Sequence, residues 1–301
     1  MVHGKRSFGD IAADVIIYAV LGALFFMCMY PFYYIFIYSI SDASAASRTL
    51  AVMLYPVKPT LNNYREVFAM EGMAMAALVS ALRTVIGTAG TVACSGFFAY
   101  LVTKPMYFRK AIYRMTIATM YFSSGLVPWY LTMRMYGLYN NFFVYVVPTL
   151  VSAYFIILIK TFIEQLPASL EESAMLDGAG FVTIFVRIVF PLSKPILATI
   201  AVFAAVGQWN TWFDNYILVQ NKELTTLQLK LYDLMRQAMA IAEKANIGAT
   251  ASGALSHLEE TITPMAIRMT VTMVVTLPIL CVYPFMQRYF VKGIMMGAIK
   301  G

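Results

Sequence analysis

SLEESAMLDGAGFVTIFVRIVFPLSKP, residues 169–195, is a polar interruption between two long apolar runs. Ser169 followed three residues later by Glu172 predicts a capping box, in which each side chain satisfies a free backbone N–H at the start of a helix. Gly178 and Gly180 are expected to end that helix, because glycine adopts the left-handed conformation of a C-cap without steric cost. The stretch therefore predicts one short helix and a glycine turn.

A second short helix is expected after this turn. Phe181, Ile184, Phe185 and Ile188 have the spacing of one apolar stripe, and Pro191 is expected to stop the helix. The sequence thus predicts a compact helix-turn-helix held on one side of a membrane.

The composition is that of an integral membrane protein. Of the 301 residues, 60% are hydrophobic and only 12% are charged, with a mean hydropathy of +0.71, whereas about one quarter of a soluble domain is charged. The net charge of +7 is spread over the ends of apolar runs, which favours a membrane orientation signal over a nucleic-acid surface. Cys28, Cys94 and Cys281 lie in apolar segments and are expected to behave as small hydrophobic residues.

Six transmembrane helices are predicted, and the fold class is an all-α polytopic membrane protein with one domain over residues 1–301. A basic loop with Lys104, Arg109, Lys110 and Arg114 but no acidic residue is expected in the cytoplasm by the positive-inside rule. With six spans, both termini and the 169–190 loop are cytoplasmic as well. The first span is too long for a signal-peptide core. The spans are residues 15–41, 76–102, 115–133, 141–162, 195–213 and 269–286.

Motifs of catalysis are missing from the sequence. It contains no G-x-x-x-x-G-K-[ST] phosphate loop, no nucleophile elbow and no H-E-x-x-H zinc motif. His3 and His257 are too far apart in the sequence to suggest a metal site. The chain is therefore expected to be neither an enzyme nor an ATP-binding protein, with no cofactor or metal of its own.

The interrupting stretch resembles the EAA loop of the transmembrane subunits of binding-protein-dependent ABC importers, although Ser173 stands where that pattern has alanine. The resemblance implies a type I importer permease fold, in which this loop is a cytoplasmic coupling helix that docks into the ATPase subunit. A plain alternative is a solvated amphipathic loop in which Glu172 is only a cap. The residues that carry over to the ATPase contact are Glu172, Ala174, Asp177, Gly178, Ala179, Ile188 and Pro191.

A wider resemblance covers nearly the whole chain. Residues 120–142, 191–198 and 264–301 resemble the oligosaccharide branch of maltose-type permeases, in particular the subgroup for fragments of complex polysaccharides. In that branch the end of the permease reaches between the ATPase subunits, which implies such contacts for Gly297, Lys300 and Gly301. A basic tail attracted to lipid head groups is the alternative.

The resemblance also implies an assembly and a mechanism. The partners are a second permease in a heterodimer, two ATPase subunits that bind ATP and Mg, and an extracellular solute-binding protein that delivers oligosaccharide. The location is the plasma membrane of a prokaryote, in contact with lipid and without nucleic acid, and the spans alternate between inward-open and outward-open states. A permease for a non-sugar solute, a self-contained carrier and a membrane scaffold remain as alternatives.

Several residues near the expected outer surface are candidates for a substrate path. Trp209, Asn210, Trp212, Asp214 and Asn215 combine aromatic faces with amides and a carboxylate, which suits sugars, yet Trp is also enriched as an interface anchor.

Arg83 in the second span either lines this path and attracts anionic, uronate-like sugars or extends to the membrane interface. An amphipathic helix is also expected from Leu224 to Lys244, lying on the bilayer or against the binding protein.

Overall fold

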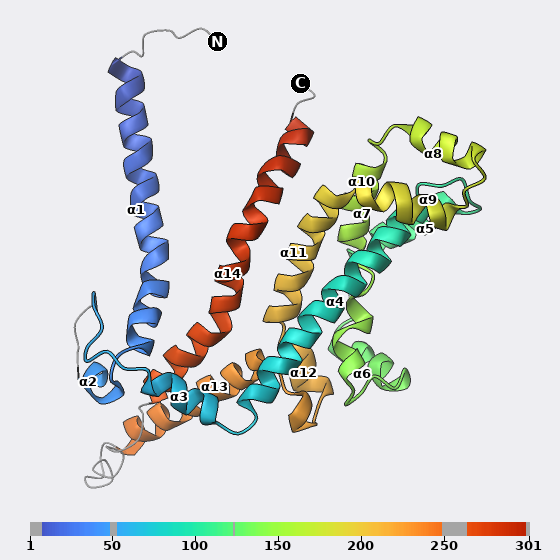
Figure 1. The fold of residues 1–301 in the computed structure, drawn as a ribbon. Coiled ribbons are helices and arrows are strands. Elements are labelled where there is room, and N and C mark those ends of the chain that lie inside the picture. The colour runs from blue at the N-terminus through green and yellow to red at the C-terminus, as the bar shows by residue number, and fades with distance from the viewer. Residues whose placement is uncertain (1–7, 49–52, 123, 249–263, 299–301) are drawn as a thin grey trace. The chain divides into compact units, whose positions relative to one another are not determined.

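The computed structural model describes residues 8–48, 53–122, 124–248 and 264–298, and nearly all regular structure in them is helical (Figure 1). One isolated antiparallel bridge joins Ser41 to Pro59. The elements are α1 (Phe8–Ser39), α2 (Ala43–Ser47), α3 (Asn62–Ala69), α4 (Met73–Leu101), α5 (Arg109–Ala118), α6 (Leu126–Met135), η1 (Phe142–Tyr145), η2 (Val147–Thr149), α7 (Ala153–Ile163), α8 (Ala168–Leu176), α9 (Phe181–Ile184), the π-helical turn η3 (Phe185–Val189), α10 (Phe190–Leu192), α11 (Lys194–Asn210), α12 (Phe213–Leu218), η4 (Lys222–Leu224), α13 (Leu227–Gly248) and α14 (Pro264–Ala298).

Three helices in the described part of the chain are long and apolar enough to cross a membrane, namely α1, α4 and α14. The number rises to five if two bent helix pairs each count as one span: η1–η2 with α7, bent by 45°, and α9–α10 with α11, bent by 82°. The prediction of one continuous helix over residues 115–133 is wrong. That region contains the end of α5 and most of α6, with Gly125 at a φ of +77° just before α6.

The contacts divide the chain into two units, and the expectation of a single domain stays a prediction. The first unit comprises residues 1–70 and 234–274. In it, the Asn63 side-chain amide at the start of α3 donates hydrogen bonds to the carbonyl oxygens of Ser39 (3.0 Å) and Ser41 (2.7 Å). A buried amide thus fixes α3 to the end of α1.

The second unit comprises residues 71–233 and 275–301, and α4 is its central helix. Glycine and other small residues on α4 allow α7 and α11 to pack closely against it. Figure 1 shows α8, α9 and α10 at one end of α4 and α12 at the other. The second unit therefore brings both predicted sites onto one helix, the 169–190 loop at one end and the substrate-path candidates toward the other.

Candidate functional site

The expected helix-turn-helix is present at residues 168–192, which we call the helix-turn segment. Its turn depends on Gly178, whose φ is +81°. The N–H groups of Gly178 and Ala179 donate to the carbonyl oxygens of Met175 (3.0 Å) and Ala174 (2.9 Å), a Schellman arrangement that ends α8. The prediction that Gly178 ends this helix is confirmed.

The predicted capping box is wrong. Pro167 occupies the N-cap position, no side chain caps the helix, and α8 begins at Ala168. Ser169 therefore lies inside the first turn, two positions after the N-cap, and cannot cap the helix. Glu172 is exposed, and no hydrogen bond or ion pair within the described residues engages its carboxylate.

The second helix also differs from its prediction. It does not stop at Pro191: α9 continues through the π turn η3 into α10, which ends at Leu192. Because the π turn shifts the register, the buried side chains are Ile184, Phe185 and Val189, whereas Phe181 is exposed. Gly180, at a φ of −78°, begins α9 and does not end α8.

The helix-turn segment has an inner and an outer face. Ala174 and Ala179 pack against the buried cluster that includes Ile184 and Phe185. Leu176, 89% exposed, and Asp177 belong to the outer face together with Glu172. Of the remaining predicted contact residues, Ile188 is half-buried and Pro191 is exposed.

A break between η2 and α7 creates a second candidate site. Residues 150–152 are not helical, and backbone polar groups at membrane depth require partners. Two buried hydroxyls of α4 provide them: Thr91 donates to the carbonyl oxygen of Thr149 (3.0 Å), and Ser95 donates to that of Leu150 (3.1 Å) and accepts from the N–H of Ser152 (3.2 Å). The break is thus a stable feature of the fold.

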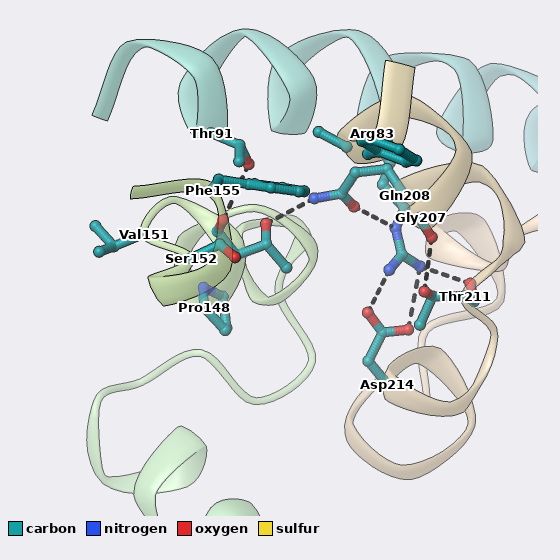
Figure 2. A pocket seen from close by; sticks show the side chains of 13 residues that line it. Arg83, Thr91, Pro148, Val151, Ser152, Phe155, Gly207, Gln208, Thr211 and Asp214 are labelled. Atoms are coloured by element: carbon teal, nitrogen blue, oxygen red, sulfur yellow. Dashed lines mark hydrogen bonds and ion pairs between the residues drawn. The ribbon is translucent and has the colours of Figure 1, made fainter. Parts of the chain in front are cut away.

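Beside this break lies a cavity of about 420 Å³, shown in Figure 2. Its wall combines charged, amide and hydroxyl groups with two phenylalanine rings. The lining residues are Arg83, Thr91, Pro148, Thr149, Val151, Ser152, Phe155, Phe203, Ala204, Gly207, Gln208, Thr211 and Asp214.

Arg83 is the most heavily bonded residue in the wall of this cavity. It is 1% exposed, and its guanidinium donates to both carboxylate oxygens of Asp214 (3.1 and 2.5 Å), to Gln208 Oε1 (3.0 Å) and to the carbonyl oxygen of Thr211 (2.9 Å). The guanidinium carbon also lies 4.7 Å from the centre of the Tyr145 ring. Arg83 therefore does not extend to the membrane interface, which was one of the two interpretations of its position in an apolar helix.

The charge of Arg83 is neutralised inside the protein. Asp214 is buried beyond the end of α11, and burial raises the pKa of its carboxyl although the charge and hydrogen bonds of Arg83 act to lower it. A bidentate carboxylate satisfies most of the guanidinium fork. The cavity consequently presents a neutral polar network and no free positive charge.

The predicted aromatic and polar group around Trp209 divides into separate contacts. Trp209 Nε1 donates to the carbonyl oxygen of Val275 (2.9 Å), whereas the Trp212 ring stacks on Tyr232 with centroids 4.1 Å apart. Asn215 is buried and its Oδ1 accepts from the N–H of Thr226 (2.8 Å), while Asn210 accepts from Gln228 on the exposed side. Of this group, only Asp214 lines the cavity.

Sequence reasoning missed Gln208 and Thr149. Gln208 links Arg83 to Thr149 Oγ1, to which its amide donates over 2.6 Å. A glutamine near the end of an otherwise apolar span was the only available signal, because its partners are 125 and 59 residues away.

The close approach of α4 and α11 at Gly87 yields a testable prediction. A Cβ at Gly87 would lie 2.5 Å from Gln208 Nε2, so Gly87→Ala should displace the amide and break both of its hydrogen bonds. We expect a loss of about 1–3 kcal/mol of stability, measured as a lower unfolding temperature of the detergent-purified protein. Gly207→Ala is the control, because its Cβ meets no atom within 4 Å; equal unfolding temperatures of the two variants would contradict the prediction.

Comparisons with known proteins match this chain over almost its full length. It is 32% identical to the polygalacturonan/rhamnogalacturonan transport system permease protein YtcP of Bacillus subtilis (strain 168), over 96% of this chain and 98% of that one. It is 34% identical to Protein LplC of the same organism, over 93% and 92%. The chain belongs to the sugar ABC transporter permeases. No family model matches it.

The permease fold is supported by a solved structure as well. The chain resembles a crystal structure of a bacterial ABC transporter involved in the import of the acidic polysaccharide alginate, with a TM-score of 0.83, 26% identity and coverage of 95% of this chain and 99% of that one. The permease is therefore a membrane transport subunit and not an enzyme, as the missing catalytic motifs predicted.

The C-terminal predictions remain open. Gly297 lies within α14, and Lys300 and Gly301 fall outside the described residues. In the part of the chain that the structure describes, no group of three or more His, Cys, Asp or Glu side chains is placed to hold a metal ion.

Proposed function

We propose that this permease passes oligosaccharides derived from acidic polysaccharides across the membrane, powered by partner ATPase subunits. The full-length similarity to a polygalacturonan/rhamnogalacturonan permease carries this proposal, and the similarity to an alginate importer supports it. Because Asp214 neutralises Arg83, the acidic preference does not rest on Arg83. The cavity provides hydroxyl, amide and phenyl groups, which suit the neutral faces of sugar rings.

The proposed assembly contains a second permease, two ATPase subunits that bind ATP and Mg, and an extracellular solute-binding protein. In this assembly the outer face of the helix-turn segment contacts an ATPase subunit. This proposed contact is supported by an exposed surface, made of Glu172, Leu176 and Asp177, next to the hydrogen-bonded turn at Gly178. Gly297, Lys300 and Gly301 stay the predicted second contact.

We propose six spans in total, with the end of α5 (residues 115–118) and α6 together forming the third span as a broken pair. Both termini and the helix-turn segment then lie on the cytoplasmic side. The basic residues Lys104, Arg109, Lys110 and Arg114 next to the end of α4 support this orientation through the positive-inside rule.

One experiment tests the proposal as a whole. The complex is purified through a tag on this permease, co-expressed with the genes beside its own, and reconstituted in vesicles with the binding protein. We expect ATPase subunits to co-purify and ATP to drive uptake of oligogalacturonate in preference to a neutral oligosaccharide of equal length. Uptake without ATP indicates a carrier, absence of an ATPase from the complex indicates a scaffold, and preferential uptake of a non-sugar solute overturns the substrate class.

A further inference from the structure

The inner side of α8 carries a charged residue that the ATPase contact does not use. Glu171, adjacent to the exposed Glu172, forms an ion pair with Lys104, which lies three residues beyond the end of α4. Their side chains are only 14% (Lys104) and 17% (Glu171) exposed. Charges sheltered to this degree are screened much less than an exposed pair, so the contact holds α8 against α4 over a range of salt concentrations.

An aromatic cluster next to this ion pair joins α4 to η3 of the helix-turn segment. The Lys104 ammonium lies 4.4 Å from the centre of the Tyr100 ring. Tyr100 and Phe97 of α4 each pack against Phe185 of the helix-turn segment, with ring centroids 5.3 Å apart in both pairs. Tyr100 is fully buried. The ion pair fixes α8, and the aromatic cluster fixes η3, to the same end of α4.

From this end α4 runs without interruption to the cavity. It is one helix from Met73 to Leu101 and contains no proline, and Thr91 and Arg83 on it line the cavity. At 1.5 Å per residue, Arg83 lies about 27 Å along the helix from Leu101. Because a continuous helix moves as a rigid body, a displacement of its end at Leu101, three residues before Lys104, is passed to the cavity wall. Figure 1 shows the helix-turn segment at one end of α4, and Figure 2 shows Arg83 in the cavity.

We propose that Lys104 and Glu171 are a positioning pair that transmits movement of α8 to α4, so that the cavity opens and closes with the ATPase. This inference rests on the proposed contact between the helix-turn segment and the ATPase. It divides the two neighbouring glutamates by role: Glu172 faces the partner, and Glu171 links the contact to the membrane helix.

A charge swap in the reconstituted complex tests the pair. The variants are Glu171→Lys, Lys104→Glu and the double swap, and the readout is sugar transported per ATP hydrolysed. We expect each single variant to assemble with the ATPase and hydrolyse ATP but to lower this ratio about tenfold, the size of a typical coupling free energy, and the double swap to restore most of it. Glu171→Gln serves as the milder variant if a single charge reversal prevents assembly.

Glu164→Lys provides the matched control. Glu164, at the C-cap of α7, pairs with Lys160 of that helix (2.7 Å), so the same charge reversal there disturbs an ion pair that does not link α8 to α4. The control should keep the normal ratio. A normal ratio in the Glu171 and Lys104 variants, or a double swap as poor as the single ones, would overturn the positioning role.

The results also distinguish a failure of the positioning pair from a failure of the proposed ATPase contact. If Gly178→Leu stops coupled transport while the Glu171 variants transport normally, only the positioning pair is wrong. If Gly178→Leu and Glu172→Gln also transport normally, the proposed ATPase contact is wrong.

Discussion

Gly178→Leu is expected to abolish ATP-driven transport. Gly178 has a φ of +81°, and a side chain with a Cβ costs about 1–2 kcal/mol in the left-handed region. A Cβ there meets no other atom within 4 Å, so the strain comes from the backbone alone. Relieving it rotates α8 away from α9, which moves the surface proposed to contact the ATPase. The measurement is ATP hydrolysis stimulated by loaded binding protein, together with uptake in vesicles.

Two further substitutions make this experiment decisive. Gly180→Leu adds the same side chain two residues later, at a φ of −78° and with open space around the Cβ, so it should retain most activity. The activity of Gly178→Asn should lie between those of Gly178→Leu and Gly180→Leu, because asparagine tolerates the left-handed region. Intact assembly and intact coupled hydrolysis in Gly178→Leu would show that the turn does not shape the contact.

Glu172→Gln isolates the contribution of charge on the same surface. Because α8 starts at Ala168 and has no side-chain cap, losing this carboxylate should leave the helix intact. We therefore expect weaker binding of the ATPase subunit at an unchanged unfolding temperature. The structure removes the earlier ambiguity between capping and partner contact, since Glu172 lies outside any capping interaction.

Arg83→Met is expected to be the most destabilising single substitution near the cavity. It leaves the Asp214 carboxylate buried without its partner, and breaking a buried ion pair in this way costs about 3–5 kcal/mol. The variant should unfold at a much lower temperature in detergent or fail to accumulate in the membrane. Adding Asp214→Asn should recover much of the loss, because asparagine removes the charge and keeps an acceptor for the N–H of Asn215, which now bonds to Asp214 Oδ1 over 2.8 Å.

Arg134→Met is the control for that experiment. Arg134 is exposed and lies 5.7 and 5.2 Å from the ring centres of Tyr130 and Tyr139, so its loss should cost about 1 kcal/mol or less. If the two arginine variants unfold at the same temperature, the Arg83 network does not stabilise the fold.

Local sequence signals predicted those parts of the structure that depend on neighbouring residues. The glycine turn at Gly178 and the small residues of α4 follow from conformational freedom and size, which are properties of single residues. The start of α8 was missed because Pro167 precedes the Ser169 motif and the helix begins before it. The π turn was missed because a hydrogen bond from the Phe190 N–H to the Phe185 carbonyl oxygen changes the register without any change in apolar content.

Long-range pairing explains the remaining errors. The apolar content of residues 115–133 predicts one helix, yet backbone geometry at Gly125 separates α5 from α6. Arg83 and Asp214 were both noticed as polar residues in an apolar setting, but 131 residues separate them. Nothing local indicates that one neutralises the other, so both were assigned to a substrate path and the buried ion pair was not foreseen.

The pairing of Arg83 with Asp214 also determines how the permease responds to membrane voltage. Moving one unpaired elementary charge across the membrane requires or releases about 2.3 kcal/mol of electrical work per 100 mV of membrane potential. Arg83 is joined to Asp214 through both carboxylate oxygens, so the two opposite charges move together and their net electrical work cancels. At this position the membrane potential therefore neither assists nor opposes a rearrangement of α4 that keeps this pair intact.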